Sequence, residues 1–121
     1  MQEKRFEPRM LCADLVEIFW TDPDGRRKKT VANLEDISLS GACLQSEVPI
    51  DPTVEVRIRT AKCRLEGVVR YCVFRDIGYF VGVQFAEGRK WSQREFRPQH
   101  LLDPRRLVNR CGKRTASQTI H

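Results

Sequence analysis

The sequence predicts a mainly β protein in which six or seven short antiparallel strands close into a barrel. Three observations lead to this prediction. Apolar and polar residues alternate with a period of two through much of the first 85 residues. Short runs of turn-forming residues separate these alternating segments. The 121 residues, 40% of them apolar, suffice for one modest core, and closing a barrel around it removes exposed strand edges.

The first two strands are predicted as a hairpin. Residues 10–20 place Val16, Ile18 and Trp20 on one face of a strand. The sequence Asp-Pro-Asp-Gly at 22–25 follows, and Asp-Gly between alternating segments is a strong turn signal. Residues 26–34 begin with charged side chains and then become apolar, so they are expected to form the return strand with a solvated start.

Four further strands are expected at 41–44, 54–59, 63–72 and 79–85. The second of these shows the clearest pattern, because valine and isoleucine alternate with charged residues along it. A proline-bounded loop precedes it, and short turns precede each of the last two strands. All four therefore suit an antiparallel arrangement with small connections.

The pattern changes after Gly88. Ser92 followed by Glu95 matches a capping box, which predicts a short helical segment near the C-terminus. Four apolar residues are expected to dock this segment on the barrel: Leu101, Leu102, Leu107 and Val108. We therefore divide the chain into a flexible leader at 1–9, a barrel domain at 10–104 and a basic, disordered tail at 105–121.

The basic charge is concentrated near the C-terminus. Lys and Arg number 22 and Asp and Glu 16, which gives a net charge of +6. Five of the basic residues lie between Arg105 and Arg114, and no acidic residue follows Asp103. Without those five, 17 basic residues remain against 16 acidic ones, so the body is nearly neutral. The excess favours a phosphate-bearing partner but does not by itself identify one.

Several classes of protein are excluded by what the sequence lacks. No apolar run approaches the roughly 18 residues of a membrane-spanning helix, and the charged N-terminus does not resemble a signal peptide. The five cysteines form no C-x-x-C motif and are expected to be reduced thiols of a cytoplasmic protein. We find no nucleophile–base pair, carboxylate dyad or zinc spacing, and we expect no catalytic residue, metal or cofactor.

Two short motifs stand out because a barrel core has no obvious need for them. Residues 5–9 read Arg-Phe-Glu-Pro-Arg, and Pro8 disfavours a helix there. Residues 36–41 read Asp-Ile-Ser-Leu-Ser-Gly and are expected between two strands. Each motif alone has a plain explanation, since N-terminal arginines are often solvated and Asp, Ser and Gly commonly build turns.

Together the motifs resemble the PilZ domain, a bacterial receptor for cyclic di-GMP. That family is marked by R-x-x-x-R near its start, which Arg5 and Arg9 match. It is also marked by [D/N]-x-S-x-x-G about thirty residues later, which Asp36, Ser38 and Gly41 match. The last strand is similar to the family's V-G-V-x-F pattern, and the resemblance covers roughly residues 4–103. It implies a barrel of PilZ type that binds cyclic di-GMP without catalysis.

The chemistry of the matched residues suits this ligand. The guanidinium of an arginine such as Arg5 or Arg9 can donate to guanine O6 and N7, stack on the base or pair with phosphate. Asp36 offers acceptors for the N1–H and N2 donors of guanine. Ser38 offers a small hydroxyl. Gly41 lacks a Cβ, so its backbone can approach the ligand or take a positive φ.

The resemblance also suggests a mechanism and a stoichiometry. The leader is expected to order over bound ligand and so to alter the surface offered to an unidentified effector protein. Lys4 precedes the first motif at a position associated in the family with ligand stoichiometry. A dimeric, stacked ligand that contacts Lys4 is therefore a further hypothesis.

Two other functions remain open at this point. One alternative is a protein-interaction adaptor that does not depend on nucleotide, and the two intact motifs argue against it. The other alternative is a nucleic-acid-binding barrel that contacts phosphates through the tail and the charged residues 26–29. The near-neutral body and the lack of a regular aromatic stripe make nucleic acid the less favoured partner.

Overall fold

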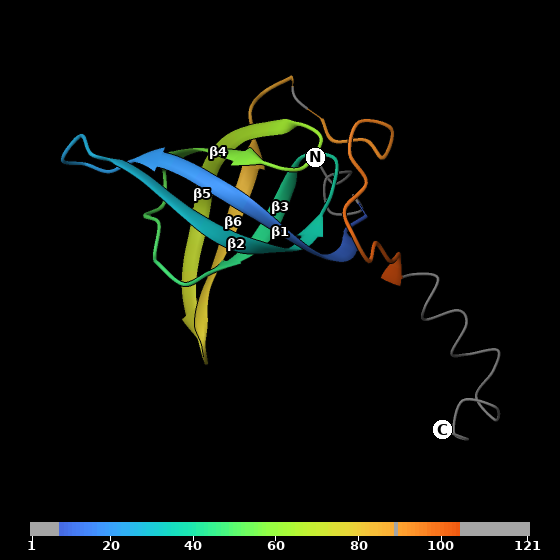
Figure 1. The fold of residues 1–121 in the computed structure, drawn as a ribbon, viewed down its shortest axis with the longest axis horizontal. Coiled ribbons are helices and arrows are strands. Elements are labelled where there is room, and N and C mark those ends of the chain that lie inside the picture. The colour runs from blue at the N-terminus through green and yellow to red at the C-terminus, as the bar shows by residue number, and fades with distance from the viewer. Residues whose placement is uncertain (1–7, 89, 105–121) are drawn as a thin grey trace, which may run out of the picture.

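Six strands form one closed antiparallel barrel in the computed structural model, which describes residues 8–88 and 90–104 (Figure 1). The predicted fold class is confirmed, with six strands. The strands are β1 (Met10–Thr21), β2 (Arg27–Ile37), β3 (Gly41–Ser46), β4 (Glu55–Arg59), β5 (Arg64–Arg75) and β6 (Gly78–Phe85). Around the barrel they follow the order β1-β2-β3-β6-β5-β4.

The first hairpin differs from its prediction at one end. The turn at 22–25 forms as expected, with Gly25 at φ +84° and its N–H donating to the Asp22 carbonyl at 2.9 Å. β2, however, continues to Ile37 and does not end at residue 34. A register shift between Leu34 and Asp36 accompanies the extension. Asp36 therefore lies within a strand and not in the connection between two strands.

The alternating apolar residues fill the barrel. Ile18, Leu34 and Ile58 are completely buried, whereas Leu15 on the opposite face of β1 is 71% exposed. The predicted inner face of the first strand is thus confirmed at Val16 and Ile18. Burial of such side chains is the main favourable contribution to folding, since each fully buried one contributes about 1.5–3 kcal/mol.

The predicted C-terminal helical segment does not form between Ser92 and Asp103. The N–H groups of Glu95 and Phe96 both donate to the Ser92 carbonyl, at 3.1 and 3.2 Å, and make a single turn. His100 has φ +58°, which a right-handed helix cannot contain. The local capping signal is overridden because Trp91 and Phe96 must both reach the core, where they are 5% and 3% exposed.

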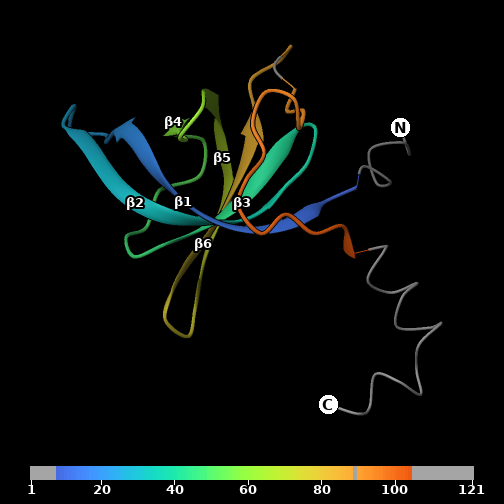
Figure 2. The same ribbon diagram turned by 45° about the vertical axis from the view of Figure 1, so that its right-hand side comes forward.

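Residues 90–103 close one end of the barrel and run beside the start of β1 (Figures 1 and 2). The indole N–H of Trp91 donates to the Phe96 carbonyl at 2.7 Å. Leu11 and Leu102 exchange backbone hydrogen bonds of 2.8 and 2.7 Å. The predicted docking residues 107 and 108 lie outside the described residues, as does the tail.

No helix in the described part of the chain is long and apolar enough to cross a membrane.

Candidate ligand-binding site

The two sequence motifs meet at an ion pair. Arg9 directly precedes β1, and Asp36 is the penultimate residue of β2. The Nη1 group of Arg9 donates to Oδ1 of Asp36 at 2.8 Å. The Arg9 side chain is 59% exposed and the Asp36 side chain only 19%. One guanidinium therefore holds a half-buried carboxylate while most of its own surface stays open to solvent.

Strand pairing places Asp36 in a row that crosses the outer face of the barrel. Residues opposite one another on neighbouring strands point to the same face. Leu11 of β1 is paired with Asp36, Asp36 with Cys43 of β3, Cys43 with Gly82 of β6, and Gly82 with Tyr71 of β5. We call these five residues the Asp36 row. They form a surface that runs from the start of β1 across β2, β3 and β6 to β5.

The aromatic ring of Tyr71 lies across Gly82. A Cβ added at Gly82 would stand 2.1 Å from the ring, so only glycine leaves room for it there. Burial raises the pKa of Tyr71 to about 12, and a hydrogen-bonding interaction with the Cys43 thiol adds to the shift. The ring thus reaches over β6 toward Cys43 and lines the Asp36 row with a neutral, partly exposed aromatic side chain.

The charge of Asp36 is maintained in an unfavourable setting. Burial raises the pKa of this carboxyl above its ordinary value, and the nearby positive charge of Arg9 only partly reverses the effect. A partly desolvated carboxylate gains most from additional hydrogen-bond donors. The structure thus presents an acceptor that a ligand with paired N–H groups would satisfy.

Ser38 and Gly41 form the turn that joins β2 to β3. The N–H of Ser38 donates to the Gly41 carbonyl at 2.8 Å, and its hydroxyl donates to the same oxygen at 3.3 Å. Gly41 does not have a positive φ, contrary to one of the two reasons expected for it. A Cβ there would lie 2.6 Å from the Val83 carbonyl of β6, so glycine is required for close packing of the two strands.

The segment that closes the barrel also anchors this turn. The backbone N–H of Trp91 donates to the Leu39 carbonyl at 3.0 Å. On the other side, the N–H of Phe85 donates to the Ser40 carbonyl at 2.7 Å. The motif turn is therefore held by β6 and by residues that follow the last strand.

The structure brings together Arg9, Asp36, Ser38 and Gly41 at one end of β2. Arg5 and Lys4 lie outside the described residues, so their positions relative to the site stay predictions. Sequence reasoning missed Cys43 and Tyr71, which come from two other strands. Gly82 is a signal in the sequence that could have pointed to Tyr71, because a glycine within a strand often marks the close approach of another group.

The site is an open surface. A depression of about 680 Å³ lies elsewhere, between the ends of β1, β4 and β5, and none of the motif residues lines it. It is bordered by residues such as Trp20, Val54 and Gly67. A ligand held at the Asp36 row would therefore need additional groups to enclose it.

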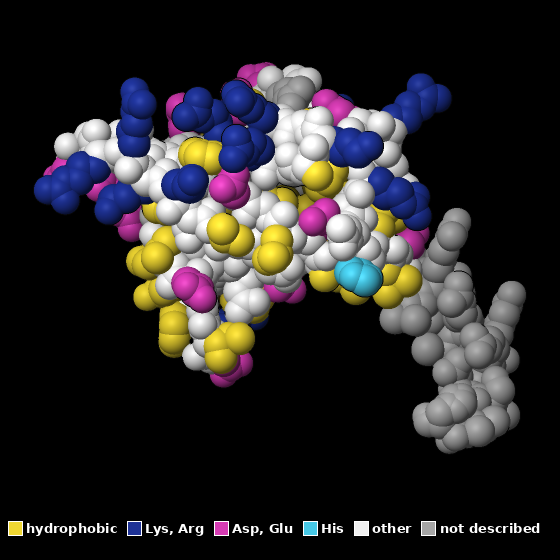
Figure 3. Space-filling view, in the orientation of Figure 1, with side chains coloured by type: hydrophobic (Ala, Val, Ile, Leu, Met, Phe, Trp, Pro, Cys, Tyr) yellow, Lys and Arg dark blue, Asp and Glu magenta, His cyan; other side chains and the backbone are white. Residues whose placement is uncertain are grey.

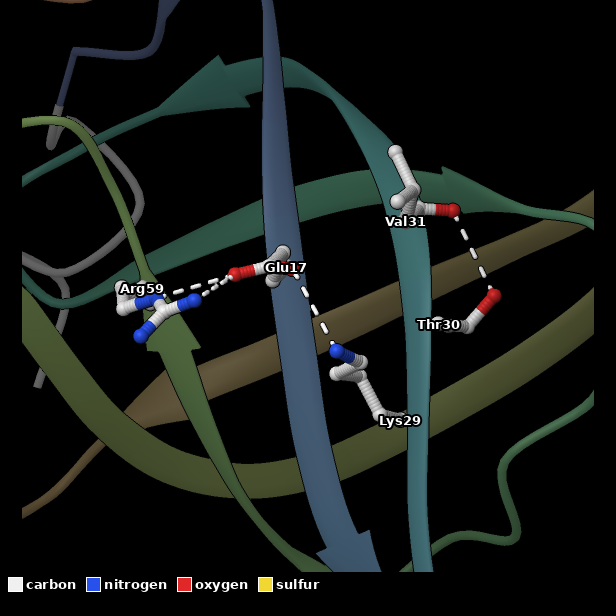
Figure 4. Close-up of polar contacts among 5 residues, drawn as sticks. All are labelled: Glu17, Lys29, Thr30, Val31 and Arg59. Atoms are coloured by element: carbon white, nitrogen blue, oxygen red, sulfur yellow. Dashed lines mark hydrogen bonds and ion pairs between the residues drawn. The ribbon is translucent and has the colours of Figure 1, made fainter.

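The basic side chains of the barrel gather on another face, over β4 and the β1–β2 hairpin (Figure 3). There Glu17 accepts a hydrogen bond from Nε of Arg59 at 2.9 Å, is contacted by the same guanidinium through Nη2, and pairs with Lys29 at 3.8 Å (Figure 4). The hydrogen bond from Arg59 lowers the pKa of Glu17. Both cations also lie over the Phe19 ring, at 5.4 and 5.9 Å. Part of this positive charge is thus already compensated within the sheet.

The comparison with protein families identifies the domain. A model of the PilZ domain matches residues 3–97, most of the chain. The chain belongs to the PilZ domain family. PilZ domains are non-catalytic binding domains and, as a family, receptors for cyclic di-GMP. No curated protein matches the chain.

Within this PilZ domain, Cys12 and Cys43 are expected to resist alkylation. Burial raises the pKa of Cys12 from 9.0 to about 12 and also raises that of Cys43. Three pH units reduce the reactive thiolate about 1000-fold. At pH 8, iodoacetamide should modify Cys12 at least about 100-fold more slowly in the native protein than in urea, as measured by peptide mass spectrometry. Partly exposed Cys63 is the internal reference, and equal native rates at Cys12 and Cys63 would contradict this expectation.

Proposed function

We propose that this protein is a non-catalytic receptor that binds cyclic di-GMP at the Asp36 row through its R-x-x-x-R and D-x-S-x-x-G motifs. One observation carries the proposal: Arg9 and Asp36, which belong to different motifs and lie 27 positions apart, meet at 2.8 Å. The PilZ match over residues 3–97 supports the choice of ligand.

Each group in the site has a role that its chemistry suits. Asp36 accepts from the N1–H and N2 amino groups of guanine, which relieves the cost of its partial burial. The exposed guanidinium of Arg9 donates to guanine or to a phosphodiester oxygen. Tyr71 offers an apolar ring surface at the far end of the row. We assign Arg5 to the second half of an arginine clamp and Lys4 to a second, stacked ligand molecule.

The proposed output is an ordering of the leader. Residues 1–9 directly precede β1 in the sequence, and Arg9 at their end contacts Asp36 of the row. Ligand bound between the row and the two arginines would fix the leader over this face and change the surface available to an effector protein. We infer a cytoplasmic receptor whose output passes through such a partner. The internal compensation of basic charge at Glu17 disfavours the alternative of a nucleic-acid-binding barrel.

A double variant, Arg5→Ala with Arg9→Ala, tests the proposal. Each arginine is assigned one or two charge-assisted hydrogen bonds, so we expect affinity for cyclic di-GMP to fall at least about 100-fold. Isothermal titration calorimetry measures this directly. The same method, applied to wild type and Lys4→Ala, tests whether Lys4 supports a second ligand molecule, since the ligand-to-protein ratio should then be lower in Lys4→Ala.

The control for this variant is Arg57→Ala with Arg59→Ala, on the basic face away from the motifs, which should leave affinity unchanged. Cyclic di-AMP and GTP should bind wild type far more weakly than cyclic di-GMP does. Absence of cyclic di-GMP binding by wild type, or equal affinity of the two double variants, would refute the proposed site.

A further inference from the structure

The β5–β6 hairpin extends beyond the body of the barrel and leaves one edge of β5 open (Figures 1 and 2). On that edge the last backbone contacts are made by Val69, whose N–H donates to Val54 at 2.9 Å and whose carbonyl accepts from Thr53 at 2.7 Å. From Arg70 to Arg75, β5 has only β6 as a neighbour. Within residues 8–88 and 90–104, no strand covers this edge.

Apolar side chains accompany the open edge. Val73 is 41% exposed, Phe74 60% and Ile77, in the turn, 82%. Apolar side chains are visible on this projecting hairpin in Figure 3. Proteins normally protect edge strands with charge, proline or a covering segment, because an open apolar edge pairs with other strands. The combination here indicates an interaction surface.

The geometry of the hairpin determines which backbone groups are available. Arg75 and Gly78 flank a two-residue turn and therefore form the hydrogen-bonded pair that closes it. Hydrogen-bonded and non-hydrogen-bonded pairs alternate along an antiparallel ladder. The N–H and carbonyl groups of Cys72 and Phe74 consequently point away from β6, toward the open edge.

We propose that a second copy of this chain adds its own β5 to this edge, antiparallel, with a two-fold axis at Val73. In this register Cys72 of each copy lies opposite Phe74 of the other, so every outward backbone group is paired. A shift by one residue would place groups that point toward β6 opposite groups that point outward, and the ladder would be lost. A two-fold interface of this kind also closes on itself and does not propagate.

Charge favours a second copy over the chain's own C-terminal segment as the occupant. In the same register Arg75 of one copy lies opposite Tyr71 of the other, where its guanidinium can lie over the ring, and symmetry repeats the pair. Residues 105–121 instead carry five basic residues and no acidic one. That segment would bring positive charge to Arg70 and Arg75.

Cross-linking through Val73 tests the register. Residues that face one another in a non-hydrogen-bonded pair have Cα atoms about 4.5 Å apart, within the range of about 4.4–6.8 Å that a disulfide spans. In full-length Val73→Cys, mild oxidation should therefore join two copies, as the two thiols lose their hydrogens to the added oxidant. The matched control is Leu15→Cys, whose site is 71% exposed on the outer face of β1. We expect cross-linking at least about 10-fold faster at position 73.

Sedimentation equilibrium on the full chain tests the association itself. Val73→Glu places two carboxylates at the axis and should weaken dimerisation at least about 10-fold. Arg75→Glu should weaken it as well, because the cation over the Tyr71 ring is lost, whereas Arg75→Lys, which keeps the charge, should weaken it less. Circular dichroism checks that each variant is folded.

Three results would overturn the proposal. The first is a wild-type chain that stays monomeric up to about 0.5 mM. The second is equal cross-linking of the Val73→Cys and Leu15→Cys variants. The third is a dimer that forms only after residues 105–121 are deleted, because the C-terminal segment would then be the occupant of the edge.

Discussion

An Asp36→Asn variant is expected to bind cyclic di-GMP about 10- to 150-fold more weakly than wild type and yet to be no less stable. The loss of affinity corresponds to about 1.5–3 kcal/mol, the usual contribution of a hydrogen bond to a charged group. An amide in place of the carboxylate removes the negative charge and one of the two acceptors for the guanine edge.

The stability of this variant follows from the pKa of Asp36, which burial raises above its ordinary value of 3.8. A raised pKa means that the folded state disfavours the charged form. The contribution of the Asp36 carboxyl to stability is therefore most favourable below its unfolded-state pKa. It becomes less favourable as the pH rises through its folded-state pKa. At pH 7 the uncharged amide avoids this cost, so the free energy of unfolding should equal or exceed that of wild type. Near pH 3 any gain should disappear.

Urea denaturation at pH 7 and pH 3, with calorimetry at pH 7, measures both effects. Asp24→Asn is the matched control, because it makes the same change at an exposed turn and should alter neither property. If Asp36→Asn unfolds more easily than wild type by over about 1 kcal/mol, the ion pair with Arg9 is a major stabilising contact and the site is not under electrostatic strain.

The fold was predictable because each strand carries its own pattern. Ile18 and Ile58 alternate with polar neighbours and are buried as expected. The register shift beside Asp36 was not predictable, because it depends on how β2 meets both β1 and β3. Without the shift, the acidic residue of the motif was placed in a connection instead of a strand.

The same limit explains the errors near Trp91 and in the composition of the site. A capping signal at Ser92 is local, whereas the burial of Trp91 and Phe96 is a tertiary effect that decides the conformation. Tyr71 reaches the Asp36 row only because β5 and β6 are paired and Gly82 leaves space for its ring. No local pattern around Tyr71 contains that information.

A Gly67→Ala variant is expected to lose at least about 2 kcal/mol of stability, more than any other glycine-to-alanine change in the barrel. A Cβ at Gly67 would stand 2.3 Å from the Gln84 carbonyl oxygen and 2.7 Å from a methyl group of Val83. Gly67 is paired with Val56 on one side and Phe85 on the other, so the backbone cannot move away without breaking a ladder.

Urea denaturation followed by tryptophan fluorescence measures this loss, and Gly25→Ala provides the comparison. Gly25 has open space around a new Cβ but a φ of +84°, so alanine there should cost about 1–2 kcal/mol. If Gly25→Ala were the more damaging change, the tight packing of β5 against β6 would be in doubt.

Gly41, the glycine of the second motif, is confined by neighbouring backbone as Gly67 is. At Gly41 a Cβ would lie 2.6 Å from the Val83 carbonyl, also backbone, so Gly41→Ala should destabilise the barrel whether or not a ligand touches it. Loss of ligand binding in that variant therefore does not establish a contact. At Gly82 the obstructing atoms belong to the Tyr71 side chain, which can turn aside. Gly82→Ala should thus reduce stability less than Gly41→Ala while displacing the ring, and it is the better probe of the site.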